Sequence, residues 1–187
     1  MSDSHRLFLA TAVPEDLVDR AIAYAQGLGI EGARWIGSQG HLTVKFLGWV
    51  TPEVRPRVIA SSAEVAARHD PAVMSLEALG AFPRPTRARV LWVGVDDPAR
   101  LLTSLAADLD EALGHHGFGT ETRAFTPHLT LARFRAPARL PPLGHLPQEV
   151  RRPWSCDHLL LYRSHLSPKG ARYEVIERWK LGGTVLP

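Results

Sequence analysis

The sequence predicts an α+β fold of two pseudo-symmetric lobes, each an antiparallel sheet with helices on its outer face. Three observations favour it. Strand-like and helix-like segments alternate along the 187 residues, the same order of segments occurs twice, and the chain ends in two strands joined by a short turn. We therefore expect one domain over residues 1–187, with lobes at about 1–85 and 86–187 and an active-site groove between them.

The first half runs strand, helix, strand, helix, strand. Residues 6–13 (RLFLATAV) are apolar and predict a buried strand, and a helix follows from Pro14 to Gly27. Residues 41–48 (HLTVKFLG) alternate apolar and polar side chains, as a half-buried strand does. Thr51 and Pro52 begin another helix, and residues 73–79 form the next strand.

The second half repeats this order. Residues 88–95 (ARVLWVGV) predict a buried strand, and Asp97 and Pro98 begin a helix that Gly114 ends. Residues 128–134 (HLTLARF) again alternate. After a Pro- and Gly-rich connection, residues 158–165 and 171–179 predict a hairpin with its turn at 167–170.

The composition is that of a globular protein without a membrane span, with 45% hydrophobic and 22% charged residues. The first five residues (MSDSH) lack the basic and then apolar pattern of a signal peptide. Cys156 is the single cysteine, so neither an internal disulfide nor a multi-thiolate metal site is expected. These features predict a cytoplasmic protein without membrane attachment.

The net charge of +3 comes with an uneven distribution of arginines. Three groups stand close together in the sequence: Arg84, Arg87 and Arg89; Arg133, Arg135 and Arg139; and Arg151 with Arg152. Such groups suit a phosphate-bearing partner, and equally they serve to solvate a surface. Charge alone leaves both interpretations open.

The feature that carries chemistry is a His-Leu-Thr sequence at the same stage of both halves. Because strand side chains alternate, His41 and Thr43 share one face, and so do His128 and Thr130. Lobes related by a twofold axis would turn these faces toward each other. One His-x-Thr alone is more often structural, whereas the duplicated pair is specific.

Two histidines on either side of a phosphodiester suit an in-line displacement. One ring takes a proton from the attacking oxygen and the other gives a proton to the leaving oxygen. With an ordinary imidazole pKa, a neutral and a protonated ring coexist near neutral pH. Threonine hydroxyls donate to the non-bridging oxygens, and we expect no metal or other cofactor.

The two motifs, HLTVKFLG and PHLTLARF, resemble the paired HxTx motifs of the 2H phosphoesterase superfamily. More narrowly, they are similar to those of the RNA 2′,3′-cyclic phosphodiesterases, also called 2′-5′ RNA ligases. RLFLATAVPEDL, FPRPTRARVLWVGV and LYRSHLSPKGARYEVI also resemble stretches of these enzymes, in the same order. The resemblance thus extends over nearly the whole chain and implies two pseudo-symmetric lobes.

The resemblance implies roles for six residues. His41, Thr43, His128 and Thr130 would be catalytic, with His128 activating water and His41 protonating the leaving O3′. Phe46 and Arg133, at equivalent positions after the two motifs, would flank the terminal nucleobase. Strict alternation places both on the face opposite the histidines, so a bulge or strand end is required, and core packing is the alternative for Phe46.

Other polar or aromatic residues are given structural interpretations. Alternation puts Lys45 on the histidine face, within reach of a phosphate, although Ala132 occupies its place in the second half. Cys156 is expected to be a small buried hydrophobe and Trp92 to pack inside a buried strand. The remaining histidines are expected at the surface or in polar core positions: His5, His69, His115, His116, His145, His158 and His165.

The sequence therefore predicts a metal-independent monomeric hydrolase that converts an RNA 2′,3′-cyclic phosphate end to a 2′-phosphate, with 2′-5′ ligation as the related reaction. Two alternatives remain. One is a phosphodiesterase acting on a small cyclic nucleotide or a 2′-5′ oligonucleotide. The other is a non-catalytic module that binds RNA ends, although such a module has no need of two titratable rings.

Overall fold

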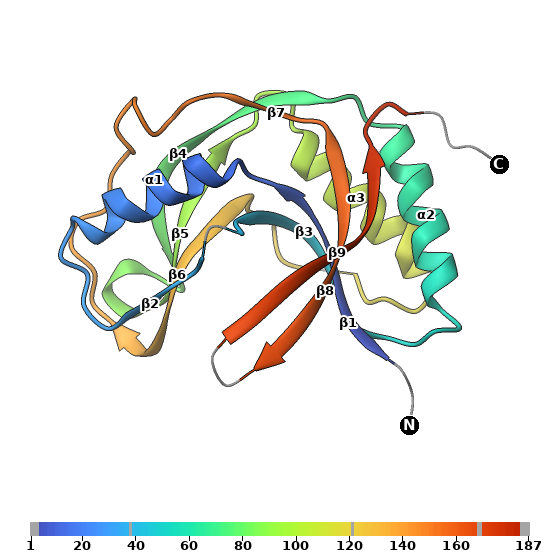
Figure 1. The fold of residues 1–187 in the computed structure, drawn as a ribbon, viewed down its shortest axis with the longest axis horizontal. Coiled ribbons are helices and arrows are strands. Elements are labelled where there is room, and N and C mark those ends of the chain that lie inside the picture. The colour runs from blue at the N-terminus through green and yellow to red at the C-terminus, as the bar shows by residue number, and fades with distance from the viewer. Residues whose placement is uncertain (1–3, 38, 121, 168–169, 184–187) are drawn as a thin grey trace.

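The computed structural model describes residues 4–37, 39–120, 122–167 and 170–183, and it has an α+β fold (Figure 1). The helices are α1 (Glu15–Gln26), α2 (Arg55–Ala67), α3 (Leu101–Gly114) and the short 3-10 helix η1 (Pro85–Arg87). The strands are β1 (His5–Ala12), β2 (Ala33–Trp35), β3 (His41–Val50), β4 (Ala72–Phe82), β5 (Ala88–Asp96), β6 (His128–Ala138), β7 (Trp154–Cys156), β8 (His158–Ser167) and β9 (Gly170–Lys180). No described helix is long and apolar enough to cross a membrane.

The predicted strands and helices are present in the predicted order. The two alternating segments form β3 and β6, and the helix predicted between Asp97 and Gly114 is α3. The first backbone amides of α3, at Leu101 and Leu102, donate to the Asp97 carboxylate at 3.0 and 2.8 Å. The predicted hairpin is β8 and β9, whose ends pair at Ser167 and Gly170; positions 168 and 169 of its turn lie outside the described residues. The three-residue strands β2 and β7 were not predicted.

The strands form one curled, largely antiparallel sheet rather than two separate sheets. Its order is β7-β4-β5-β6-β3-β1-β8-β9, and β2 pairs with β6. The two halves meet at the β3–β6 pair, through Leu42 opposite Leu129. Because β8 and β9 join β1 while β4 joins β5, the halves of the sheet do not coincide with the segments 1–85 and 86–187.

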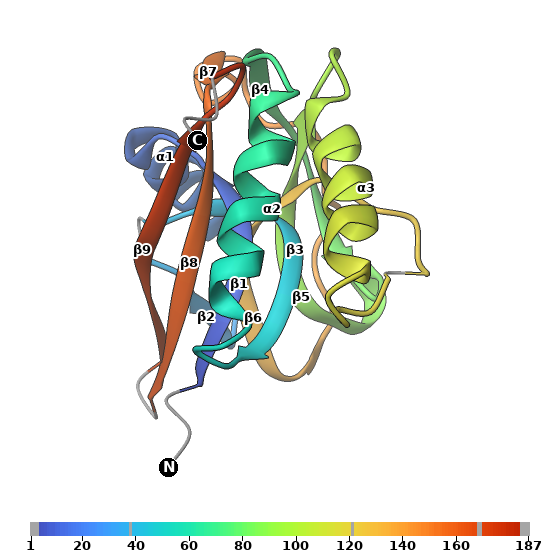
Figure 2. The same cartoon turned by 90° about the vertical axis from the view of Figure 1, so that its right-hand side faces the viewer.

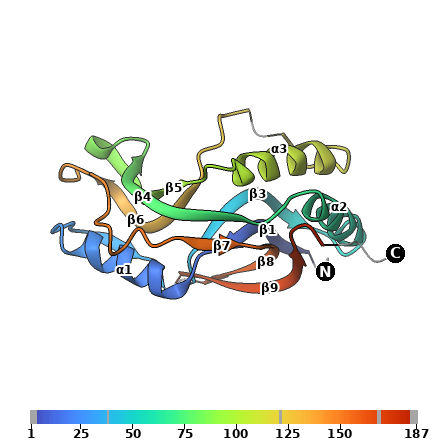
Figure 3. The same cartoon turned by 90° about the horizontal axis from the view of Figure 1, so that it is seen from above.

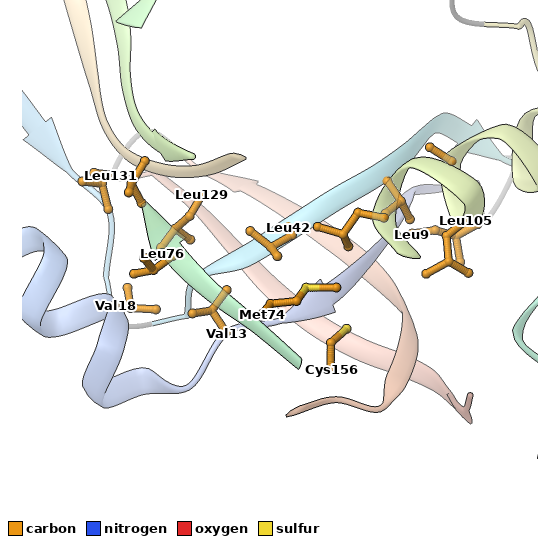
Figure 4. Close-up of a cluster of buried hydrophobic side chains, with 14 of the residues drawn as sticks. Leu9, Val13, Val18, Leu42, Met74, Leu76, Leu105, Leu129, Leu131 and Cys156 are labelled. Atoms are coloured by element: carbon orange, nitrogen blue, oxygen red, sulfur yellow. The ribbon is translucent and has the colours of Figure 1, made fainter. Parts of the chain in front are cut away.

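The helices cover the outer face of the sheet, as predicted. Helix α1 packs on β6, while α2 and α3 pack together against β9 and β3 (Figures 2 and 3). Buried side chains fill the space between helices and sheet, with Val18 of α1 near Leu129 and Leu131, and Leu105 of α3 near Leu9 (Figure 4). Cys156 belongs to this core, and burial raises the pKa of its thiol to about 11. The prediction that Cys156 is a small buried hydrophobic residue is therefore confirmed.

The core also determines the direction in which the histidine motifs face. Leu42 and Leu129 are 1% and 0% exposed, and each is worth roughly 1.5–3 kcal/mol of burial. A slip of one residue in either strand would expose its leucine and bury its histidine. The packing of the two leucines therefore fixes the neighbouring histidines and threonines on the inner face of the sheet.

Candidate active site

The structure brings the two His-x-Thr motifs together at the centre of the sheet. Since Leu42 and Leu129 pair antiparallel and point into the core, His41, Thr43, His128 and Thr130 lie on the opposite face, here called the histidine face. The positive charge of a protonated His128 contributes to lowering the pKa of His41, so the two rings interact electrostatically. The sequence prediction that the motifs share one site is consistent with this placement.

The two imidazoles are held in the same way. His41 Nδ1 lies 3.3 Å from the carbonyl oxygen of Gln39, and His128 Nδ1 lies 2.7 Å from that of Thr126. A carbonyl oxygen only accepts, so Nδ1 carries the hydrogen in both rings. Each neutral ring therefore keeps a basic Nε2 that is not engaged in this hydrogen bond, which is the atom that a proton-transfer reaction requires.

Aromatic side chains surround each histidine. His41 lies against the rings of Phe8, Tyr162 and Tyr173, with centroids 4.8, 5.5 and 4.8 Å away. These residues come from β1, β8 and β9, which pair in register so that Phe8 lies opposite Tyr162. The rings shield His41 from water and restrict its orientation.

Aromatic rings also enclose His128, from β4 and β5. Phe82 meets its ring edge-on at 5.0 Å, and the Trp92 ring lies 6.0 Å away. Trp92 pairs across the sheet with Thr130 and lies over Gly80, where a Cβ would come within 2.2 Å of the indole. Trp92 thus has the predicted packing role within an interior strand, and its indole packs on the histidine face beside the site.

Burial makes both histidines less basic than an ordinary imidazole. It lowers the pKa of His41 to about 4, assisted by the charges of Arg133 and His128 and opposed by the hydrogen bond to Gln39. Burial likewise lowers the pKa of His128, with the Thr126 carbonyl opposing and Arg133 assisting. Contrary to the expectation of one protonated ring near neutral pH, both rings of the free protein are then mainly neutral at about pH 7.

Phe46 and Arg133 reach the histidine face through the bulges that their positions require. In β3 the register with β1 shifts between Lys45 and Thr43, and in β6 the register with β5 shifts between Ala132 and Thr130. Each strand thus gains one extra residue after the threonine, which reverses the alternation. Core packing is excluded for Phe46, whose side chain is 67% exposed with its ring 6.0 Å from that of Phe8.

The first bulge turns Lys45 away from the histidines. Lys45 is buried on the helix side, where its ammonium pairs with Asp110 of α3 and donates to the Gly119 carbonyl at 3.0 Å. The prediction that Lys45 shares the histidine face is therefore wrong. Strict alternation misplaced it, because the bulge depends on the pairing with β1.

Several other histidines have partners outside the two motifs. His116 lies 3.0 Å from Ser61, and His158 and His165 lie 2.7 Å from Asp157 and Glu174. Among the described residues, no group of three or more His, Cys, Asp or Glu is arranged to hold a metal ion.

Phe8, Phe82, Tyr162 and Tyr173 were missed as site residues. Their strands were predicted, but nothing local in the sequence indicates that β1 and the β8–β9 hairpin bring three rings to His41. A regular alternation of Phe8 with Leu7 and Leu9 was the available signal, since it puts Phe8 on the face opposite the core.

A curled antiparallel sheet with helices outside and two His-x-Thr strands paired at its centre defines the two-histidine class of phosphoesterases. Comparison with known families agrees, since the model of the 2′-5′ RNA ligase superfamily matches residues 33–167. The chain belongs to this superfamily.

Relatives from several organisms match almost the entire chain. The RNA 2′,3′-cyclic phosphodiesterase of Thermus thermophilus is 33% identical over 186 residues, covering 95% of this chain and 91% of that protein. The enzyme of the same name from Escherichia coli K12 is 29% identical, covering 97% of this chain and 99% of that protein. The crystal structure of E. coli LigT complexed with 3′-AMP superposes with a TM-score of 0.81 at 26% identity, covering 96% of this chain and 99% of that one.

Proposed function

We propose that the protein is an RNA 2′,3′-cyclic phosphodiesterase, a hydrolase that converts a terminal cyclic phosphate to a 2′-phosphate. The observation that carries the proposal is the matched pair His41 and His128. Both come from strands paired at Leu42 and Leu129, and both engage a backbone carbonyl through Nδ1. Relatives named RNA 2′,3′-cyclic phosphodiesterase, from bacteria and archaea, support the choice of substrate.

The reaction needs two proton transfers and no redox step. Water attacks phosphorus as the P–O3′ bond breaks; one histidine takes the proton of the water and the other gives a proton to O3′. The products are a 2′-phosphate and a 3′-hydroxyl. If a 5′-hydroxyl replaces water, the same exchange forms a 2′-5′ linkage, but water is far more concentrated and hydrolysis dominates.

We assign His128 as the base and His41 as the acid. The shorter Nδ1–carbonyl contact, 2.7 Å, belongs to His128, and a strongly accepting carbonyl makes Nε2 a better proton acceptor. His41, with a pKa of about 4, is a strong acid once protonated. A bound phosphate raises both pKa values through its negative charge, so the pair of rings takes up one proton from the solvent when the substrate binds.

Thr43 and Thr130 would donate their hydroxyl hydrogens to the non-bridging phosphate oxygens as charge develops. Phe46 and Arg133 would hold the terminal nucleobase between an exposed ring and a guanidinium. Arg133 also lies close enough to lower the pKa of both histidines, which supports its position beside the phosphate.

Both histidines come from one chain, which supports a monomer as the active unit. The two rings supply both proton transfers, so we propose that the reaction needs no metal. A cytoplasmic location remains a prediction from the sequence.

The test is to incubate a short RNA ending in a 2′,3′-cyclic phosphate with the protein in EDTA and to determine the position of the product phosphate by NMR. We expect a 2′-phosphate from the wild type and from His115→Ala, which changes an exposed histidine of the α3–β6 connection. His41→Ala and His128→Ala are expected to lose turnover by a factor of about 10²–10⁴. A 3′-phosphate product, or turnover that survives in either motif variant, contradicts the proposal.

A further inference from the structure

Two arginine groups that are separate in the sequence meet where β5 begins beside the end of β6. Val90 pairs with Arg133 and Ala88 with Ala138, and the Arg89 guanidinium donates to the Arg135 carbonyl at 2.7 Å. Helix η1 packs on the end of β6. The resulting cluster, the arginine rim, comprises Arg84, Arg87, Arg89, Arg133, Arg135 and Arg139.

The positive charge of the arginine rim is not balanced by nearby carboxylates. The sequence contains no Asp or Glu from 78 to 95 or from 122 to 148. Among residues with described positions, none of the six arginines forms an ion pair with a carboxylate. Side chains that merely solvate a surface are commonly interspersed with opposite charge, so this imbalance favours a polyanionic partner.

The β8–β9 hairpin is different, because its arginines have acidic neighbours. Arg163 pairs across the strands with Glu174, and Arg163 and Arg172 contribute to lowering the pKa of this carboxyl, after the larger effect of the hydrogen bond from His165. Both the hairpin and the rim flank the histidine face, but the hairpin carries Glu174 and Glu177 among its basic residues, whereas the segments that form the rim carry no carboxylate.

The arginine rim is continuous with the proposed active site through Arg133. This residue lies on the histidine face and acts electrostatically on both His41 and His128, while Arg135 follows two positions later on β6. Strand β2 adds Arg34 directly opposite Arg133. A nucleic acid strand whose end lies at the histidines would thus meet a row of guanidinium groups if it runs along β6.

We propose that the arginine rim binds the backbone phosphates of the RNA strand that leads to the cyclic end, so that the strand leaves the site over β6 and η1. The inference rests on the proposed function, since it takes the RNA end to lie at the histidines. Guanidinium groups bind phosphates without reading sequence, so the contacts favour an oligonucleotide over a mononucleotide 2′,3′-cyclic phosphate.

The test compares three variants that each remove two positive charges. The rim variant is Arg87→Gln/Arg135→Gln, whose side chains are exposed. The hairpin variant is Arg163→Gln/Arg172→Gln. The control is Arg57→Gln/Arg68→Gln, with Arg57 in α2 and Arg68 directly after it, on the outer face of the sheet. KM is measured for a short RNA and for a mononucleotide, both carrying a 2′,3′-cyclic phosphate, across a range of salt concentrations.

We expect the rim variant to raise the ratio of the oligonucleotide KM to the mononucleotide KM by about five- to ten-fold at low salt. For single strands the salt slope of log affinity is about −0.7 for each phosphate contact, so losing two contacts flattens the slope by about 1.4. The hairpin variant and the control should leave this ratio close to that of the wild type. An unchanged ratio in the rim variant, or a rise in the hairpin variant instead, overturns the inference.

Equilibrium binding separates this inference from the proposed function. A fluorescent RNA that already ends in a 2′-phosphate needs no turnover, and its anisotropy gives Kd for each variant. Weaker binding and a flatter salt slope in the rim variant support the arginine rim even if the wild type hydrolyses neither cyclic substrate. If the wild type hydrolyses the cyclic substrates but all variants have equal Kd values, the inference that the arginine rim binds RNA is wrong, while the proposed function is unaffected.

Discussion

Replacing His41 by glutamine should make the protein less sensitive to acid. Glutamine keeps a polar side chain that can donate to the Gln39 carbonyl, but it cannot take a proton. In the wild type the pKa of His41 falls from 6.5 in the unfolded chain to about 4 in the folded one, mainly because the ring is buried. The unfolded chain therefore binds this proton first as the pH falls.

The size of the effect follows from this difference in pKa. A folded pKa below the unfolded one means that stability is fully present above pH 6.5 and is lost as the pH falls toward 4. Over the whole window the difference of about 2.5 pH units corresponds to about 3 kcal/mol. By about pH 5 the wild type should already have lost about 2 kcal/mol more than His41→Gln.

The assay is urea unfolding followed by tryptophan fluorescence at about pH 7.5 and about pH 5, in buffers without phosphate, since a bound anion would raise the pKa again. His115→Gln, which removes an exposed histidine, serves as the control and should follow the wild type. If His41→Gln and the wild type lose the same free energy of unfolding between the two pH values, burial of the His41 ring does not lower its pKa, and the electrostatic description of the site is wrong.

Three further predictions concern the neighbours of the histidines. Because both histidine pKa values are lowered in the free protein, kcat/KM should be optimal below pH 6.5. Arg133→Gln should move this optimum to higher pH, because it removes a charge that lowers both pKa values. A pH optimum that stays in place in this variant refutes the prediction. Phe46→Ala should raise KM about ten-fold, because base stacking is lost. Its Tm should be nearly unchanged, since Phe46 is 67% exposed. A large fall in Tm with a normal KM would show a packing role instead. Lys45→Met should lower the free energy of unfolding in urea by about 2 kcal/mol, which is less than for a fully buried pair because Asp110 is 20% exposed. The folded variant should retain its kcat. Loss of kcat without loss of stability would show that Lys45 acts in the active site.

Local patterns predicted most of the fold and the face of the sheet on which the two His-x-Thr motifs lie. Periodicity gave the long strands and helices, and the alternation within HLTVKFLG and HLTLARF placed His41, Thr43, His128 and Thr130 correctly relative to the core. These features depend on neighbouring residues along one strand, which the sequence displays directly.

What could not be predicted depends on pairing between distant strands. Lys45 was misplaced because the bulge after Thr43 arises from the register with β1. The rings of Tyr162 and Tyr173 reach His41 only because the last two strands return beside β1. The low pKa values have the same origin, because they come from burial under side chains of other strands.

The central claim, that His41 and His128 act as one acid–base pair, is tested most directly by kcat on an RNA 2′,3′-cyclic phosphate for His41→Asn, His128→Asn and the double variant. Groups that act as a unit are not additive, so each single variant should lose about 10²–10⁴ in kcat and the double variant should be little worse than the poorer single one. A single variant that keeps nearly full kcat, or losses that multiply in the double variant, would contradict the account.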